Sequence, residues 1–156
     1  MPEIQKKIII NLEELVDNME VNFESRTVLR VRYGETDQMG YCYYGNYAQY
    51  FEVGRVEALR EAGMSYRAME EKGIMLPVSE FSVNYFIPAL YDDELTIITK
   101  IISLKGARLV FEYEIFNEKN QLIAKAATRL VFVTKSTMRP TKAPDEFIQL
   151  LEKHTL

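Results

Sequence analysis

A helix with one apolar stripe, followed by four segments of strand composition, restricts the fold more than any other feature of the chain. From residue 46, apolar residues recur at steps of three and four, which predicts a helix that ends at Gly63. Because the connections after it are short, we expect the strands to form an antiparallel meander. The strand-like segments are residues 76–87, 95–102, 108–116 and 122–133.

Residues 27–33 (TVLRVRY) interleave apolar side chains with arginines, which predicts a fifth, half-buried strand before the helix. Five strands and one very apolar helix fit an α+β domain in which a curved antiparallel sheet buries the helix. We place this domain over residues 26–156. Residues 1–25 are expected to form an N-terminal arm, in which residues 8–19 have the apolar spacing of a short helix. Two further short helices are expected over residues 65–72 and 141–153.

The composition excludes several classes of protein. With 156 residues and 47% apolar side chains, the chain has the size of one domain with a substantial core. A formal charge of -4 argues against a nucleic-acid-binding protein, which needs a basic face. The first twenty residues contain no apolar run long enough for a signal peptide or a membrane span. We therefore expect a cytoplasmic protein without a membrane span.

The rare residues exclude several kinds of chemistry. Cys42 is the only cysteine, so the chain forms no intramolecular disulfide and no cysteine cluster for zinc, and we expect no metal site. Without a histidine partner, Cys42 is expected to be a small packed side chain. His154 is the only histidine and lies close to the C-terminus, where chains fray, which disfavours a histidine base. Hydrolysis would have to rest on carboxylates, hydroxyls and backbone dipoles.

The loop before the long helix combines a carboxylate with a helix start. A thioester carbonyl becomes an oxyanion when it is attacked, and N–H groups at a helix N-terminus stabilise that charge. Asp37 lies seven residues before Tyr44, which allows the loop to bring the acid over the helix start. Taken alone, an aspartate in such a loop more often serves turn geometry. The loop residues of interest are Glu35, Asp37, Gly40, Gly45 and Asn46.

The tyrosines around this loop fit two roles. Tyr41, Tyr43, Tyr44 and Tyr47 form a dense aromatic run that can line an acyl or aryl pocket or pack the helix against the sheet. We expect both roles in part.

The stretch VRYGETDQMGYCYYGNYAQYFEVGRVEALREAG resembles the signature of hotdog-fold thioesterases of the 4-hydroxybenzoyl-CoA thioesterase type and their short-chain acyl-CoA relatives. The similarity continues in VNYFIPALYDDELTI, SLKGARLVFEYEI and MRPTKAP, and so covers roughly residues 27–148. The signature positions are Tyr33, Asp37, Gly40, Asn46, Tyr47, Phe51, Glu52 and Arg55.

The resemblance implies a hotdog fold, in which a five-stranded antiparallel sheet wraps around a long central helix. It also implies hydrolysis of a coenzyme A thioester, with no cofactor other than the coenzyme A of the substrate. Active sites would lie at the dimer interface of a homodimer or homotetramer. No nucleic acid partner is expected.

Individual residues acquire roles from the same resemblance. Asp37 falls on the family's catalytic aspartate, a nucleophile or a general base. Tyr44 falls where the 4-hydroxybenzoyl-CoA group has a tyrosine whose backbone N–H polarises the thioester carbonyl, and Gly45 would assist it. Many short-chain members have histidine at the position of Tyr44, so this difference leaves the substrate class open.

The remaining candidate residues would bind the substrate. Glu52 is a weaker acid/base candidate, and its alternative is an ion pair with Arg55. Residues expected to shape or orient the acyl side are Tyr33, Gly40, Asn46, Tyr47 and Glu52. Coenzyme A carries several phosphates, so basic side chains at an exposed rim are expected to bind it, although each alone also fits a solvated surface role. These candidates are Lys105, Arg108, Arg139 and Lys142.

Two other functions stay open at this point. An acyl-carrier-protein thioesterase would use the same chemistry on a different thioester carrier. A binding protein would retain acyl-CoA affinity without turnover. Dehydratases of this fold rely on an active-site histidine, which disfavours that class.

Overall fold

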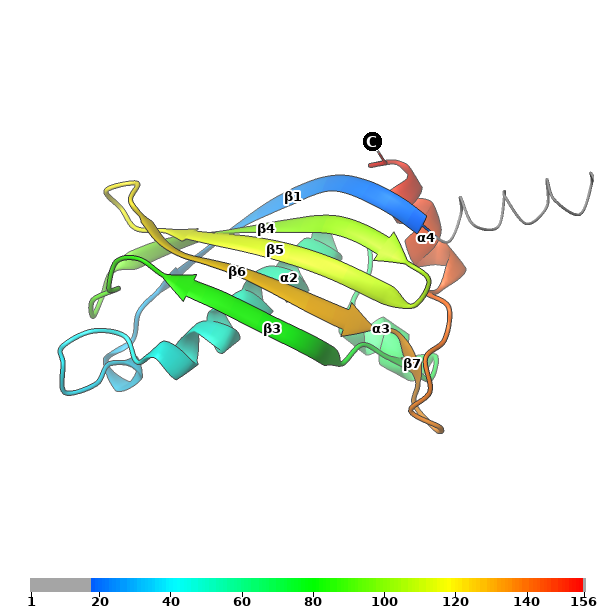
Figure 1. Ribbon diagram of the computed structural model, residues 1–156, viewed down its shortest axis with the longest axis horizontal. Coiled ribbons are helices and arrows are strands. Elements are labelled where there is room, and N and C mark those ends of the chain that lie inside the picture. The colour runs from blue at the N-terminus through cyan, green and yellow to red at the C-terminus, as the bar shows by residue number, and fades with distance from the viewer. Residues whose placement is uncertain (1–17, 156) are drawn as a thin grey trace, which may run out of the picture.

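The computed structural model describes residues 18–155, which form one curved antiparallel sheet with a long helix against it (Figure 1). The strands are arranged in the order β1-β4-β5-β6-β3, and every neighbouring pair is antiparallel. Their bounds are β1 Asn18–Arg30, β3 Val78–Tyr85, β4 Glu94–Lys105, β5 Arg108–Phe116 and β6 Leu122–Val131.

Helix α2 (Tyr47–Glu61) packs its apolar stripe against the sheet, mainly over β1 and β4. Phe51, Ala58 and Leu59 on this stripe are almost completely buried. Gly54 lets the helix approach β4 closely, because a Cβ built there would lie 2.5 Å from Thr99 Oγ1. The predicted architecture, a five-stranded antiparallel sheet around a long helix, is therefore confirmed.

The smaller elements close the ends of the sheet. The predicted short helix after α2 is α3 (Tyr66–Glu71), which Ser65 caps by accepting a 3.1 Å hydrogen bond from Ala68 N. The predicted last helix is α4 (Asp145–Glu152), which follows Pro144 and buries Phe147 and Leu151. β6 ends at Val131, two residues earlier than predicted. Beyond it, β2 (Ile74–Met75) and β7 (Val133–Thr134) form a separate two-stranded antiparallel sheet. None of the helices in the described part of the chain is long and apolar enough to cross a membrane.

The predicted position of the first strand was wrong. β1 begins at Asn18 rather than residue 27, and it ends at Arg30 rather than residue 33. Met19, which we expected at the end of a helix, lies in β1 because alternate side chains from Met19 and Val21 onward are buried against the core. β1 passes residues 25 and 26 without a break, and the rest of the predicted helix over residues 8–19 lies outside the described residues.

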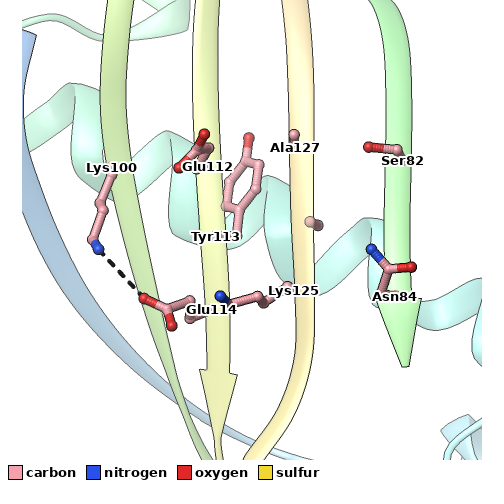
Figure 2. Close-up of a pocket in the computed structure, with 9 residues that line it drawn as sticks. Ser82, Asn84, Lys100, Glu112, Tyr113, Glu114, Lys125 and Ala127 are labelled. Atoms are coloured by element: carbon pink, nitrogen blue, oxygen red, sulfur yellow. Dashed lines mark hydrogen bonds and ion pairs between the residues drawn. The ribbon is translucent and has the colours of Figure 1, made fainter. Parts of the chain in front are cut away.

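The two faces and the edges of the sheet differ in chemistry. Figure 2 shows polar side chains on the face turned away from α2, where Lys100 Nζ lies 3.4 Å from Glu114 Oε1 above a shallow pocket of about 330 Å³. β3 is an edge strand, and almost all of its residues are exposed. Phe81 and Tyr85 are more than 40% exposed there. A long edge strand with exposed aromatic side chains is a surface on which another strand can pair.

Candidate active site

The loop between β1 and α2 folds back on itself before the helix begins. Asp37 N donates to Tyr41 O at 3.0 Å, and Gly40 N donates to Asp37 O at 3.0 Å. Gly40 has φ +84°, a left-handed conformation that glycine adopts without strain. Thr36 and Cys42 face each other in an isolated bridge at the base of this turn. The turn therefore holds the half-buried Asp37 at a defined place, and the bridge at its base lies two residues before the helical turn at Tyr44.

The two carboxylate oxygens of Asp37 have different surroundings. Oδ1 accepts a 2.8 Å hydrogen bond from Met39 N, which fixes the side chain in the turn. Oδ2 has no hydrogen-bond partner among residues 18–155. One oxygen thus has a structural role, and the other is free to interact with a substrate or a water molecule.

The start of α2 presents unpaired backbone donors. Tyr44–Asn46 forms a single 3₁₀ turn that leads into the helix, and Asn46 N donates to Tyr43 O at 3.0 Å. The N–H groups of Tyr44 and Gly45 have no acceptor in the described part of the chain, and both residues are exposed. Unpaired N–H groups and the helix dipole together favour negative charge at this point. A developing oxyanion is the charge that such donors suit.

An aromatic pocket adjoins these donors. It has a volume of about 210 Å³. Tyr85 from β3 donates its hydroxyl to Tyr44 O at 3.0 Å and packs edge-on against Tyr47, with ring centroids 5.0 Å apart. Burial raises the pKa of Tyr47 to about 12. The lining residues are Tyr41, Cys42, Tyr44, Tyr47, Tyr85, Phe86, Ile87 and Pro88.

Cys42 is buried and lines this pocket. Its Sγ lies 3.4 Å from the hydroxyl of Tyr50. Burial raises the pKa of the thiol, so it stays protonated at neutral pH. This environment agrees with the predicted role as a packed side chain.

Glu35 is a buried carboxylate to which sequence reasoning assigned no role of its own. Its Oε1 accepts from Arg32 N at 2.8 Å and from the Tyr50 hydroxyl at 2.9 Å. Its backbone oxygen accepts from Tyr43 N and from Asn46 Nδ2, both at 2.8 Å. The Asn46 side chain therefore fastens the loop. Tyr50 lies fifteen residues away in the chain, so no local sequence pattern reveals the contact.

Two other predicted residues are more remote from the pocket. Tyr33 is 78% exposed and packs edge-on against Tyr91, at a centroid distance of 5.6 Å. Glu52 is exposed. Neither residue lines the aromatic pocket.

The alternative ion pair between Glu52 and Arg55 does not form, and that prediction was wrong. Arg55 is 8% exposed and donates to the hydroxyls of Tyr66 at 2.9 Å and Tyr113 at 3.2 Å. The side chain turns inward because these two hydroxyls, on α3 and β5, satisfy its N–H groups beneath the helix. Arg55 is thus a buried link between α2, α3 and β5.

The four basic candidates for coenzyme A belong to elements at the other end of the sheet: Lys105 and Arg108 flank the turn between β4 and β5, and Arg139 and Lys142 follow β7 (Figure 1). The Asp37 loop follows Arg30, which pairs with Glu94 at the first residue of β4, whereas Lys105 is the last residue of that strand. The eleven steps from the first to the last of the twelve residues of β4 span about 36 Å, at ~3.3 Å per step. One chain therefore does not bring these residues to its own Asp37 loop.

The basic end contains a pocket that sequence reasoning missed in part. Lys105 and Arg108 line a hollow of about 420 Å³ together with Arg129, which the sequence had not singled out. Lys105 lies 3.6 Å from Glu20, and Arg129 lies 3.3 Å from Glu80. The other two candidates, Arg139 and Lys142, lie beyond β7, and Lys142 lies 3.9 Å from Asp145.

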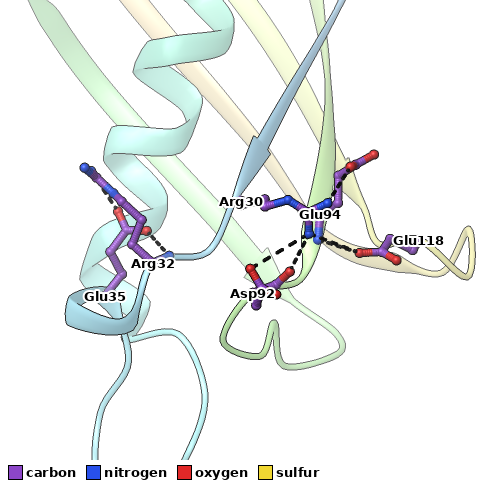
Figure 3. Close-up of polar contacts among 6 residues, drawn as sticks. All are labelled: Arg30, Arg32, Glu35, Asp92, Glu94 and Glu118. Carbon is purple, nitrogen blue, oxygen red and sulfur yellow. Dashed lines mark hydrogen bonds and ion pairs between the residues drawn. The ribbon is translucent and has the colours of Figure 1, made fainter.

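The end of the sheet next to the Asp37 loop is acidic. Figure 3 shows Arg30 among three carboxylates, those of Asp92, Glu94 and Glu118, at 3.9, 3.2 and 3.9 Å. All four side chains are substantially exposed, so these ion pairs contribute little to stability. Three carboxylates around one guanidinium leave this end negative, opposite in sign to the end with Lys105, Arg108 and Arg129.

Comparisons with known proteins agree on one family. The family model of the thioesterase-like superfamily matches residues 31–151. The acyl-CoA thioester hydrolase YbgC of Escherichia coli is 34% identical over 123 residues, which cover 79% of this chain and 92% of the relative. The DHNA-CoA thioesterase of Staphylococcus aureus superposes with a TM-score of 0.81 at 35% identity, covering 84% of this chain and 90% of that one.

A more distant structure shows the same fold. A mutant 4-hydroxybenzoyl CoA thioesterase in complex with 4-hydroxybenzoyl CoA superposes with a TM-score of 0.75 at 23% identity, covering 82% of this chain and 98% of that one. The family predicted from the sequence is thereby confirmed: the chain belongs to the thioesterase-like superfamily and has the hotdog fold.

Proposed function

We propose that this acyl-CoA thioester hydrolase carries out its reaction at the Asp37 loop, with Asp37 as nucleophile or general base and the Tyr44 N–H, assisted by Gly45, as oxyanion donor. The observation that carries this proposal is that two unpaired N–H groups at the start of α2 follow directly on the turn that holds a carboxylate with one free oxygen. The hydrolase activity itself follows the family and the relatives, among them YbgC.

The chemistry has two forms that lead to the same products. As a nucleophile, Asp37 attacks the thioester carbonyl and releases the thiolate of coenzyme A, and water then cleaves the resulting anhydride. As a general base, Asp37 removes a proton from the water that attacks the carbonyl. In both forms negative charge develops on the carbonyl oxygen, where the two N–H groups stabilise it. The products are a free acid and coenzyme A.

We propose that the aromatic pocket accepts the acyl group. Its walls are apolar rings from the loop, from α2 and from the end of β3, which suit an aryl or a short acyl group. The S. aureus relative, a DHNA-CoA thioesterase, supports an aryl group among the substrates. Tyr47 and Gly40 would shape this side of the site. Tyr33 and Glu52 do not line the aromatic pocket, so they would contact the substrate only from the exposed surface around the pocket.

A second copy of the chain would complete the site. Lys105 and Arg108 are separated from the Asp37 loop of their own chain by the length of β4, about 36 Å, so they would not bind coenzyme A at that chain's own Asp37. The exposed edge of β3 runs between the two ends: Tyr85 contacts the loop, and Glu80 pairs with Arg129 at the basic end. Two-fold antiparallel pairing of β3 edges would place the basic end of one copy beside the acidic loop end of the other.

The first experiment measures thiol release by the purified protein from short-chain, long-chain and aryl acyl-CoA esters, beside the same acyl groups on an acyl carrier protein. We expect turnover with at least one coenzyme A ester. Turnover only with the carrier protein would favour the alternative activity, which the 28% identity to an Arabidopsis thaliana acyl-acyl carrier protein thioesterase keeps open. Tight binding without thiol release across the panel would refute the proposal.

The second experiment tests whether two chains share a site. Asp37→Asn and the double variant Lys105→Glu/Arg108→Glu are each prepared as weakly active proteins and then mixed. If the basic side chains serve the Asp37 of a partner, mixed dimers contain one intact site and activity returns at low acyl-CoA concentration. If both act within one chain, mixing restores nothing. Light scattering on the unmixed proteins checks that each remains a dimer.

A further inference from the structure

We propose that Glu35 is a positioning residue for thioester hydrolysis, which holds the N–H groups of Tyr44 and Gly45 in place relative to Asp37. This inference rests on the proposed function of the loop. Glu35 does not touch the pocket. It would act through the backbone segments on either side of the reacting groups.

The backbone oxygen of Glu35 binds both flanks of the oxyanion segment. It accepts from Tyr43 N, one residue before Tyr44, and from Asn46 Nδ2, one residue after Gly45, each at 2.8 Å. Two bonds to one oxygen leave the peptide units between them little freedom to rotate. The direction of the Tyr44 and Gly45 N–H groups is therefore set from a single point.

The side chain of Glu35 fixes that point in space. Its Oε1 accepts from Arg32 N at 2.8 Å and from the Tyr50 hydroxyl at 2.9 Å, and its Oε2 lies 3.4 Å from Arg32 Nη2. Tyr50 is buried in α2, so the carboxylate joins the loop to the body of the helix. Asp37 lies two residues further along the same segment, so the link also fixes the beginning of its turn.

The chemistry argues for placement rather than charge. A carboxylate close to a developing oxyanion repels it, so the negative charge of Glu35 does not help the transition state. Burial of a carboxylate also costs desolvation free energy, which the hydrogen bonds that Glu35 accepts must offset. A neutral side chain with an acceptor at the same place should therefore preserve most of the function, whereas removal of the acceptor should not.

The test compares kcat and KM for Glu35→Gln, Glu35→Ala and Tyr50→Phe on the best acyl-CoA ester. Misplacement of reacting groups by about 1 Å lowers rates by roughly a hundredfold. We expect kcat of Glu35→Ala to fall by about ten- to a hundredfold, with KM within about twofold. Glu35→Gln should stay within about threefold of wild type, because Oε1 can still accept from Arg32 and Tyr50. The kcat of Tyr50→Phe should lie between those of Glu35→Ala and Glu35→Gln. This variant provides the test if Glu35→Ala does not fold.

Tyr113→Phe is the matched control for a merely structural effect. It removes a buried hydroxyl that bonds to Arg55 and Thr128, away from the loop. We expect Tyr113→Phe to lose about as much thermal stability as Glu35→Ala and to keep the wild-type kcat. Wild-type kcat in folded Glu35→Ala, or an equal loss in Glu35→Gln, would overturn the positioning role. If Asp37→Asn also retains turnover, the proposed function fails as well; if it does not, only the role of Glu35 fails.

Discussion

Replacing Gly54 with alanine tests the close contact between α2 and the sheet. The new Cβ would lie 2.5 Å from Thr99 Oγ1 and 2.9 Å from Ile97 Cγ2. On an exposed helix, alanine in place of glycine stabilises by about 1 kcal/mol. Overpacking of a buried position costs about 1–3 kcal/mol, and here the upper part applies because β4 is held between two other strands. We expect the free energy of unfolding to fall by about 1–2 kcal/mol.

Urea denaturation measures this change, with Gly34→Ala as the control. A Cβ at Gly34 meets no atom of residues 18–155 within 4 Å, so its effect should stay within about 0.5 kcal/mol. In the double variant Gly54→Ala/Thr99→Ala, the loss should be smaller than the sum of the two single losses, because the oxygen that the Cβ meets is gone. If Gly54→Ala is as stable as wild type, α2 does not approach β4 as closely as the 2.5 Å contact at Thr99 requires.

Three further changes have defined outcomes. Thr99→Val should raise the free energy of unfolding by about 1 kcal/mol in urea denaturation, because the buried Oγ1 has no hydrogen-bond partner in the described residues. Because the pKa of Tyr47 is raised to about 12, its contribution to stability is complete below pH 10 and is lost as the pH rises toward 12; Tyr47→Phe should flatten that decline in pH-dependent unfolding. Gly45→Ala should lower kcat several-fold with little change in melting temperature, because among the described residues its Cβ meets only the exposed Tyr43 ring, at 2.8 Å.

Much of the fold is predictable because its periodicities are distinct. The stripe of α2 repeats at the helical period over fifteen residues, and the later strands alternate at the strand period. The start of β1 fails this test, since Met19 also fits the helical spacing of the apolar residues before it. Pairing with β4, which decides in favour of a strand, involves residues about eighty positions away and leaves no local pattern.

The candidate site is predictable only where it is local. Asp37 and Tyr44 belong to one loop, so the family signature and the helix start identify them together. Glu35 and Tyr85 act through contacts with distant parts of the chain, and burial of the Glu35 carboxylate is not visible in sequence. The sequence also shows the charge of Lys105, but it does not show at which end of the sheet Lys105 lies, because that depends on the strand order.

The turnover number of Asp37→Asn, measured by thiol release at saturating acyl-CoA, tests the proposed chemistry most directly. Asparagine keeps the Oδ1 that accepts from Met39 N, so the turn and the melting temperature should be preserved. The carboxylate that attacks the thioester or activates water is lost. We predict that kcat falls by about a hundred- to ten-thousandfold. A folded variant with wild-type turnover would contradict the assignment of Asp37 as nucleophile or base.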